Sequence, residues 1–354
     1  MVGDAGRPAR VIGVMSGSSL DGLDLALCSF ERSDNGWHGR IEQARTVPFP
    51  PALLARLRGA MDATALEAAR LNRDLGDHIG EACRSLAAGG PVDLVCSHGH
   101  TLFHRPEEGL TAALGCGARI AVRAGIPTVC DLRTTDVALG GQGAPLVPLA
   151  ERLLFPGREA FLNLGGIANL AVHRTGTTGY DIGPCNQALD HLARQAGKPY
   201  DADGALAREG TVKDDLLAAL EALPFYRQPP PRSLGREWFE AEMRPLIDEP
   251  GILLSDRLRT VSEHVARRIA TELDRHAVRS VLVTGGGAHN AHLLERVGDQ
   301  CKAKLRVPEA LLVEFKEAYL FALLGLLRWR GEVNALASVT GATRDSAGGA
   351  VYLP

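Results

Sequence analysis

A turn rich in glycine and serine, set between two apolar runs, is the feature that most limits what this chain can fold into. The stretch 13–24 (GVMSGSSLDGLD) follows Val11–Ile12 and leads into the apolar run 23–30, and its turn holds Ser16, Gly17, Ser18, Ser19, Asp21 and Gly22. Two apolar runs joined by small residues predict a β-hairpin. Hydroxyl and backbone N–H groups in such a turn can hold phosphate oxygens, and glycine permits close approach of the backbone. The candidate phosphate-binding residues are Ser16, Gly17, Ser18, Ser19, Leu20, Asp21 and Gly22.

The same turn has a purely structural interpretation, as a tight hairpin built from common turn residues. It does not end in Gly-Lys-Ser/Thr, and no helix clearly follows it, so it is not a Walker P-loop. The turn alone does not decide between these two interpretations.

Length and charge narrow the class of protein. A chain of 354 residues suits two domains. Its formal net charge of −3, without a long basic block, argues against nucleic acid or an anionic membrane as a partner. Seven dispersed cysteines without a Cys-x-x-Cys pair are typical of reduced thiols, and no apolar run reaches membrane-spanning length. With no signal-peptide pattern at the start, we expect a cytoplasmic protein.

Both halves of the chain begin with the same succession of expected elements. In the first half, the hairpin is followed by a strand at 41–48, helical spacing over 52–88 and a strand at 92–96. In the second half, strands are expected at 160–164, 167–173 and 178–181. A helix at 184–195 follows, with Pro184 in its first turn. These patterns predict mixed sheets packed by helices. We place one domain at 1–145 with 337–354 and the other at 146–336.

A second glycine-rich turn lies late in the chain. A strand expected at 279–283 leads into Thr284–Asn290 (TGGGAHN), and a helix at 291–297 follows with Asn290 as its N-cap. The N–H groups at the start of a helix attract phosphate, so this turn is a good place for a nucleotide. The turn does not match the dinucleotide fingerprint, which disfavours a Rossmann oxidoreductase.

Several short motifs follow one another along the chain: MSGSSLDGLD (15–24), SHGHT (97–101), DLR (131–133), ALGGQGAPL (138–146), NLGGIAN (163–169), DIGPCN (181–186), GGGAHN (285–290) and VTGA (339–342). Each motif is weak alone, but their number and order make a strong signal that covers the chain from about residue 11 to its end. Taken together, they resemble the motifs of the anhydro-N-acetylmuramic acid kinase family.

The resemblance implies an α/β protein of the actin, hexokinase and Hsp70-like ATPase superfamily. Two RNase-H-like domains with mixed five-stranded sheets flanked by helices would enclose ATP in an active-site cleft between them. The implied reaction is hydrolytic opening of a 1,6-anhydro sugar coupled to phosphorylation of O6. Its product, N-acetylmuramic acid 6-phosphate, belongs to peptidoglycan recycling. The family also implies a homodimer.

The resemblance assigns roles to individual residues. Asp181 would be the general base that activates water, and Glu317 would contact the sugar near that water. The alternatives are that Asp181 only positions Mg²⁺ or caps a helix, and that Glu317 is a solvated residue at a helix start. The nucleotide would be held by the hairpin turn together with Gly183, Gly285, Gly286 and Asn290. Phosphoryl transfer implies Mg²⁺, for which Asp21 is our choice of ligand, while Asp24 has a structural alternative.

Four residues in two family loops are candidates for sugar binding: His98, Thr101, Arg133 and Asp136. Arg133 could pair with the lactyl carboxylate of the sugar or form an ordinary ion pair. A metal site formed by His98, His100 and His104 is disfavoured, because no acidic or cysteine cluster accompanies them. Cys185 could be a reactive thiol or a packing residue.

Three positions depart from the usual family pattern: Ser18 and Ile182 stand where threonine is common, and His100 replaces a frequent glutamine. These departures leave open a different 1,6-anhydro sugar as substrate. Two further alternatives are another sugar kinase of the superfamily and a non-catalytic nucleotide-binding sensor.

Overall fold

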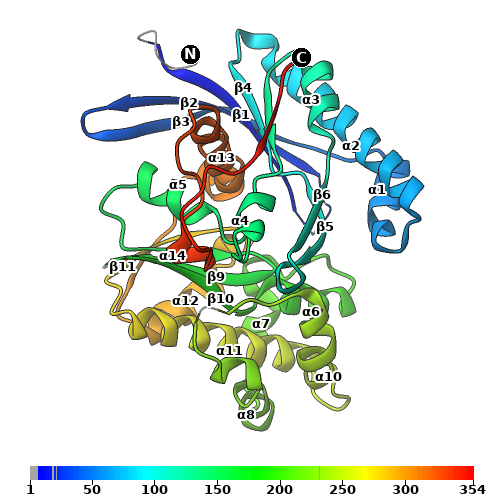
Figure 1. Cartoon of the computed structure of the whole chain (residues 1–354). Helices are drawn as coiled ribbons and strands as arrows, with labels where there is room; N and C mark the ends of the chain where they lie inside the picture. The colour runs from blue at the N-terminus through cyan, green and yellow to red at the C-terminus, as the bar shows by residue number, and fades with distance from the viewer. Residues whose placement is uncertain (1–6, 18–19, 21, 175, 231) are drawn as a thin grey trace. The chain divides into compact units, whose positions relative to one another are not determined.

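The computed structural model describes residues 7–17, 20, 22–174, 176–230 and 232–354. The chain divides into two compact units, Met1–Pro156 with Phe315–Pro354 and Gly157–Glu314 (Figure 1). From the sequence, we expected the domain boundaries after residue 145 and before residue 337. The difference near residue 315 arises because most of helix α13 (Ala310–Trp329) packs on the first unit's sheet.

The first unit is built on a sheet of six strands in the order β13-β7-β4-β1-β2-β3. β2 lies antiparallel to both of its neighbours, β1 and β3, whereas β4 and β7 run parallel to β1. The opening hairpin is confirmed. The expected sheet of five strands gains a sixth because the C-terminal β13 pairs with β7. The strands are β1 Ala9–Ser16, β2 Leu23–Ser33, β3 Gly36–Val47, β4 Leu94–Ser97, β7 Thr128–Cys130 and β13 Ala350–Tyr352.

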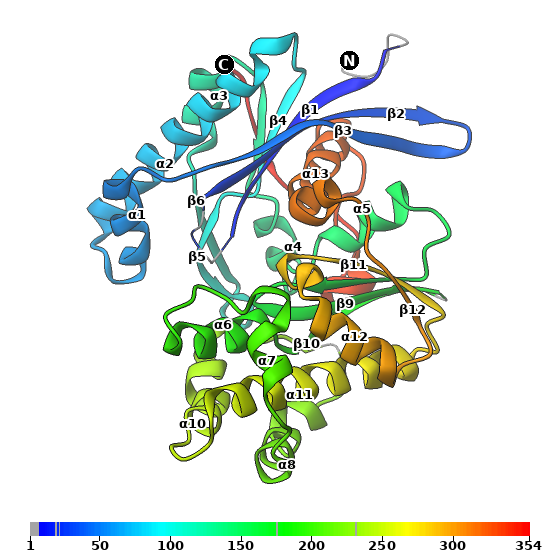
Figure 2. The same cartoon turned by 180° about the vertical axis from the view of Figure 1, so that it is seen from behind.

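Alternation along β1 decides which helix covers which face of this sheet. Ile12 and Val14 enter a core shared with α2, while Gly13 faces α13. A Cβ atom on Gly13 would lie 1.8 Å from the carbonyl oxygen of Ala318, so only glycine permits this approach. Figures 1 and 2 show α2 and α3 on one face and α13 on the other. The helices of this unit are α1 Pro51–Arg58, α2 Ala65–Leu86, α3 Gly117–Ala124, α4 Thr134–Ala138, α5 Val147–Leu154, α13 and α14 Ala337–Thr340.

A small hairpin in this unit was not expected from the sequence. β5 (His100–Arg105) pairs with β6 (Leu110–Leu114), so Thr101 lies on a strand where a loop was predicted. The turn between them closes at Gly109, whose φ of 68° lies in the left-handed region. The alternation of the two strands is weak in the sequence because both are largely half-buried or exposed.

The second unit repeats the strand order of the first. Its sheet runs β10-β9-β8-β11-β12, with β8, β9 and β10 antiparallel and β11 and β12 parallel to β8. This matches β3-β2-β1-β4-β7 in the first unit. The predicted pair of RNase-H-like domains is therefore confirmed. The strands are β8 Ala160–Leu164, β9 Ile167–His173, β10 Thr177–Pro184, β11 Ser280–Thr284 and β12 Lys304–Arg306.

The start of helix α6 differs from the prediction. α6 begins at Asn186, and Pro184 is the last residue of β10, where it pairs with Ile167 of β9. The prediction was wrong because proline is tolerated on an edge strand as well as in the first turn of a helix. The other helices of this unit are α7 Ala205–Glu209, α8 Asp214–Glu221, α9 Arg236–Trp238, α10 Arg244–Ile247, α11 Leu254–Arg275 and α12 Ala291–Gln300.

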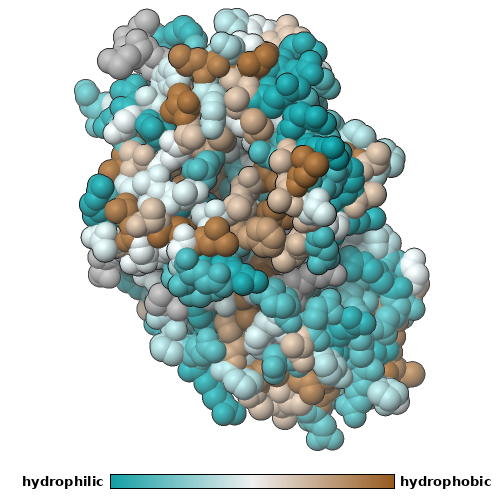
Figure 3. Space-filling view, turned by 45° about the vertical axis from the view of Figure 1, so that its right-hand side comes forward, coloured by the Kyte–Doolittle hydropathy of each residue, from teal (hydrophilic) through white to brown (hydrophobic). Residues whose placement is uncertain are grey.

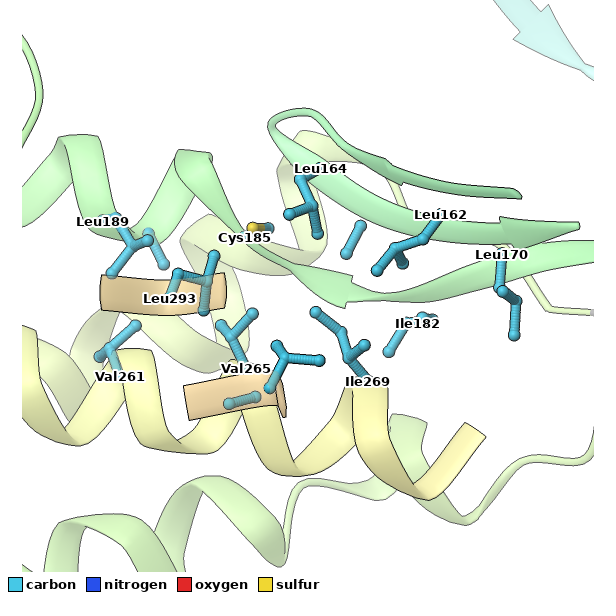
Figure 4. Packing of buried hydrophobic residues seen from close by; sticks show 14 of the residues in the cluster. Leu162, Leu164, Leu170, Ile182, Cys185, Leu189, Val261, Val265, Ile269 and Leu293 are labelled. Atoms are coloured by element: carbon cyan, nitrogen blue, oxygen red, sulfur yellow. The ribbon is translucent and has the colours of Figure 1, made fainter. Parts of the chain in front are cut away.

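The core of the second unit lies between its sheet and α11. Figure 4 shows Leu162, Leu170 and Ile182 on the strands facing Val265 and Ile269 of the helix. Ile182 is 1% exposed, so burying its side chain contributes about 2 kcal/mol. This packing fixes the orientation of β10.

Exposed large hydrophobic residues are spread along the chain, among them Met61, Val122 and Leu253, and on the face that Figure 3 shows hydrophobic residues lie among hydrophilic ones. Within the described part of the chain, no helix combines the length and the apolar character needed to cross a membrane.

Candidate active site

Asp181 lies on β10, the edge strand of the second sheet, at a bulge between Asp181 and Gly183. Its Oδ2 accepts a hydrogen bond from the Leu234 N–H at 2.9 Å. Its own N–H donates to the carbonyl of Arg232 at 3.0 Å. Among the described residues, no hydrogen-bond partner is found for Oδ1. The carboxylate is thus held by one oxygen and keeps the other available to take a proton.

Burial raises the pKa of Asp181 to about 6, an effect that the Leu234 N–H and the Arg232 guanidinium oppose. An ordinary aspartate has a pKa near 4 and is a weak base at neutral pH. A pKa near 6 leaves Asp181 ionised at pH 7 and makes it a stronger base, as general-base catalysis requires.

Gly183, two residues after Asp181, contacts a network of buried polar side chains. A Cβ atom at this position would lie 2.8 Å from the Tyr226 hydroxyl. That hydroxyl is 2.9 Å from Nε2 of His264, whose Nδ1 is 2.6 Å from a carboxylate oxygen of Glu221. Burial lowers the pKa of His264. This network supports the backbone beside Asp181 from the side of α11.

The second glycine turn joins β11 to α12. Gly285 has φ 82°, and Asn290 caps α12 by accepting a hydrogen bond from the Leu293 N–H at 3.0 Å, which confirms the predicted N-cap. Gly286 is exposed, while Gly287 packs on Leu164. The turn therefore presents its backbone ahead of a capped helix, the arrangement that binds phosphate groups.

Gly285→Ala is expected to weaken ATP binding by about tenfold or more, because one strained residue costs roughly 1–3 kcal/mol. A Cβ atom there would lie 2.6 Å from Oδ1 of Asn163, in addition to the positive φ. The matched control is Gly298→Ala within α12, where an added Cβ atom would meet nothing within 4 Å. Calorimetric titration of both variants with ATP checks this prediction. Equal affinities would remove Gly285 from the nucleotide site.

In the first unit, the end of β1 enters the hairpin turn. Ser16 is buried, and its hydroxyl lies 3.1 Å from Nδ1 of His100. The Leu20 N–H donates to the carbonyl of Gly17 at 3.2 Å. The predicted ligands Ser18, Ser19 and Asp21 lie outside the described residues. His100, one of the departures from the usual family pattern, therefore contacts a candidate phosphate-binding residue directly.

Arg133 and His98 form a closely packed pair. Nε and the Nη2 group of Arg133 lie 3.1 and 2.8 Å from Nε2 of His98, and Nη1 donates to the Gly143 carbonyl at 2.7 Å. Burial lowers the pKa of His98 to about 3, so its ring is neutral. Nε2 then accepts from the guanidinium while Nδ1–H donates to the Gly99 carbonyl at 3.0 Å. The ring of His98 also packs on Phe321, at 4.7 Å between centroids. Arg133 is therefore held in one orientation, and some of its N–H groups take no part in these hydrogen bonds.

Both carboxylate oxygens of Asp136 accept hydrogen bonds from neighbouring residues. Its Oδ2 accepts from the Gly143 N–H at 2.8 Å, and Oδ1 accepts from the Thr340 hydroxyl at 2.7 Å. The side chain is 1% exposed. Asp136 shapes the 140–143 loop that Arg133 also contacts, so we propose that it acts on the sugar through this loop. Thr101 is half-buried on β5, opposite Ala113.

Glu317 lies on α13, next to the buried ion pair between Lys316 and Glu151, whose atoms are 2.9 Å apart. Burial raises the pKa of Glu317, while Lys316 and Arg133 act against this rise. The same proximity of Arg133 and Glu317 favours the charged guanidinium, whose pKa burial lowers. His98, Arg133 and Glu317 thus form one polar cluster in the first unit.

The structure changes the interpretation of two residues that the sequence singled out, Ile182 and Cys185. Ile182 points into the core shown in Figure 4, so its replacement of a threonine concerns packing on the inner face of the sheet. Cys185 is fully buried, which raises the pKa of its thiol to about 12 and makes it a packing residue.

Sequence reasoning missed Arg232 and Leu234, which contact Asp181, and the Lys316–Glu151 pair beside Glu317. A signal for the first two was present, because a Pro-rich segment at 229–231 leads directly into Arg-Ser-Leu-Gly. The Lys316–Glu151 pair has no sequence signature, since its members are far apart in the chain.

Comparison with known proteins gives the family. A ROK family glucokinase from Streptomyces griseus, solved with glucose and AMPPNP, aligns at 14% identity and a TM-score of 0.44 over 90% of this chain and 99% of that one. The anhydro-N-acetylmuramic acid kinase of Gloeobacter violaceus is 38% identical, with 95% of this chain and 97% of that protein aligned. That of Azorhizobium caulinodans is 35% identical, with 98% and 99% aligned. The family model described as "Anhydro-N-acetylmuramic acid kinase" matches residues 9–354. The chain therefore belongs to the anhydro-N-acetylmuramic acid kinase family.

Proposed function

We propose that this protein is an ATP-dependent kinase that opens the 1,6-anhydro ring of anhydro-N-acetylmuramic acid and phosphorylates O6. The product, N-acetylmuramic acid 6-phosphate, serves peptidoglycan recycling and amino-sugar catabolism. The observation that carries the chemical part of this proposal is the carboxylate of Asp181. It lies at a bulge near the end of β10, burial raises its pKa to about 6, and among the described residues hydrogen-bond partners are found for one of its oxygens alone.

Asp181 acts as the general base in this mechanism. Its Oδ1 takes a proton from a water molecule as the water oxygen forms a bond to C1 of the sugar. The C1–O6 bond breaks, and O6 forms a bond to the γ-phosphorus of ATP as the bond from that phosphorus to the bridging oxygen of ADP breaks. The Leu234 N–H keeps Oδ2 in place during the proton transfer, which limits the loss of orientation that a free carboxylate would suffer.

The polar cluster of the first unit binds the sugar. Arg133 pairs with the lactyl carboxylate through the N–H groups that it does not use on His98 and Gly143. Glu317 hydrogen-bonds the sugar near the reacting centre. Thr101 offers a hydroxyl from the β5–β6 hairpin.

Backbone groups of the two glycine turns hold the nucleotide. Ser16 and Gly17 approach the phosphates in the first unit, with His100 holding the Ser16 side chain. Gly285, Gly286 and the capped helix α12 do so in the second unit.

Mg²⁺ would neutralise charge on the transferring phosphoryl group, and it takes one or two carboxylates in addition to phosphate oxygens. The carboxylates of the opening turn have the right chemistry for it, and we propose Asp21 as the ligand. Asp24 has a structural role, since it accepts a hydrogen bond from the Thr46 hydroxyl at 2.6 Å.

A cytoplasmic location and a homodimer are also proposed. All seven cysteines are free thiols, which supports a reducing compartment. The homodimer rests on the family alone.

The second candidate substrate, a 1,6-anhydro sugar without the lactyl group, is tested through Arg133. Arg133→Met is expected to raise KM for anhydro-N-acetylmuramic acid roughly 10- to 100-fold, because a charge-assisted hydrogen bond is lost. KM for 1,6-anhydro-N-acetylglucosamine should stay unchanged. Phosphorylated product is measured by mass spectrometry for both sugars, with Arg105→Met as control, since Arg105 forms an exposed ion pair with Glu108. Equal rises in KM for both sugars would exclude lactyl recognition by Arg133.

A further inference from the structure

We propose that a buried ion pair, Arg232 with Glu272, positions Asp181 for water activation and sets the charge that this carboxylate faces. The proposal rests on the role of Asp181 as general base. It gives a function to two residues that bind neither sugar nor nucleotide in the mechanism above.

Arg232 and Leu234 hold Asp181 at three points. The Asp181 N–H donates to the Arg232 carbonyl at 3.0 Å, and Nε of Arg232 donates back to the Asp181 carbonyl at 3.2 Å. Two residues later, the Leu234 N–H binds the carboxylate itself at 2.9 Å. The segment 232–234 therefore determines both the backbone and the side-chain position of Asp181. Any movement of this segment would move the carboxylate relative to the water that it activates.

The guanidinium of Arg232 is itself firmly anchored. Its Nη2 group lies 2.7 Å from Oε1 of Glu272, and its Nη1 group donates to the Gln228 carbonyl at 2.8 Å. The two side chains of the ion pair are only 3% and 5% exposed. The guanidinium also lies over the ring of Phe225, 4.9 Å from its centroid. Such a planar group, bound on several sides, has one orientation available.

Glu272 joins this assembly to α11, the helix that packs on the sheet. Its Oε2 accepts a hydrogen bond from the Tyr180 hydroxyl at 2.9 Å, so β10 is held on both sides of the Asp181 peptide. A buried ion pair is often no more stabilising than well-packed apolar side chains of the same size. The main contribution of this ion pair is therefore to hold Asp181 in position, rather than to stabilise the fold.

The pair also determines the charge near Asp181. Arg232 is the cation that touches the Asp181 backbone, and its positive charge favours the ionised carboxylate. Glu272 partly cancels this charge. Among the described residues, further titratable groups face this assembly: Tyr180 on β10, Tyr226 beside Gly183 with Arg268 over its ring, and Arg275 and His276 at the end of α11. Burial lowers the pKa of His276, so its ring is neutral at pH 7.

Two single variants should shift the pH profile in opposite directions. Glu272→Gln leaves the charge of Arg232 uncancelled, so the acidic limb of kcat/KM is expected to move to lower pH. Arg232→Gln removes the cation and leaves Glu272 charged, so the limb should move to higher pH. Each shift is expected to be about half to one pH unit. The measurement is the kcat/KM profile for anhydro-N-acetylmuramic acid between pH 5 and 8.

The matched control is Glu263→Gln, another buried acid of α11, which pairs with Arg267 and Arg296. It should leave the limb in place. If Arg232→Gln does not fold, the double variant Arg232→Gln/Glu272→Gln, which removes both charges of the pair, should still move the limb to higher pH, because the removed cation is the group that contacts Asp181. A purely structural pair would lower activity without moving the limb, and this result would overturn the proposal. Retained turnover in Asp181→Asn would instead overturn the base assignment.

Discussion

Asp181→Asn is expected to lower kcat by about 10³-fold while ATP binding stays unchanged. The asparagine keeps the size of the side chain and can still accept the hydrogen bond from Leu234, but it cannot take a proton from water. Single-turnover product formation measures the loss, and calorimetric titration measures ATP affinity. The control is Asp203→Asn, an exposed aspartate of the same unit.

The same variant should be more stable than the parent protein at pH 7. The pKa of Asp181 in the folded state, about 6, is above the ordinary value of 3.8, so the folded protein binds this proton more tightly than the unfolded chain. The free energy of unfolding therefore falls as pH rises from about 4 to 6 and stays low above that range. Asparagine removes this cost, so the melting temperature of the variant should exceed that of the parent at pH 7 and the gain should shrink towards pH 4. Undiminished turnover would contradict the role of Asp181, whatever the melting temperatures.

Glu317→Gln is expected to lower kcat by about 10²-fold, since a carboxyl group that exchanges hydrogen bonds or protons with the sugar would be replaced by an amide. Burial already raises the pKa of Glu317, and the Lys316–Glu151 pair fixes the helix turn that presents it. Glutamine keeps the shape of the side chain, so the fold should be unaffected. Steady-state kinetics with the sugar, together with a melting curve, checks both statements.

The control for this variant is Glu314→Gln, an exposed glutamate on the same helix, which should behave as the parent protein does. If both variants lose the same activity, the effect belongs to the helix, and Glu317 has no specific contact with the reacting sugar.

Much of the fold could be predicted because it depends on local patterns. The opening hairpin of β1 and β2, the three strands that open each half and the cap at Asn290 follow from residue types close together in the chain. The β5–β6 hairpin and the sixth strand β13 were missed because short, partly exposed strands lack alternation and depend on a distant partner. Pro184 was misplaced because one residue type suits two local structures.

The candidate site likewise has a part that the sequence predicts and a part that it does not. Asp181, Arg133 and Glu317 could be named from motifs, but their surroundings could not. The neutral His98 beside Arg133, the Leu234 N–H on Asp181 and the buried pair of Arg232 with Glu272 all join residues that are far apart in the chain. The Ile182 departure looked like a lost hydroxyl in the sequence, whereas the fold turns that side chain into the core.

The most direct test of the central claim is the mass of the product formed from ATP, Mg²⁺ and 1,6-anhydro-N-acetylmuramic acid in ¹⁸O-labelled water. Hydrolytic ring opening coupled to phosphorylation predicts a sugar that gains one phosphoryl group and one labelled water oxygen, both in the same molecule. A phosphorylated sugar that keeps its anhydro ring and carries no label would contradict the account.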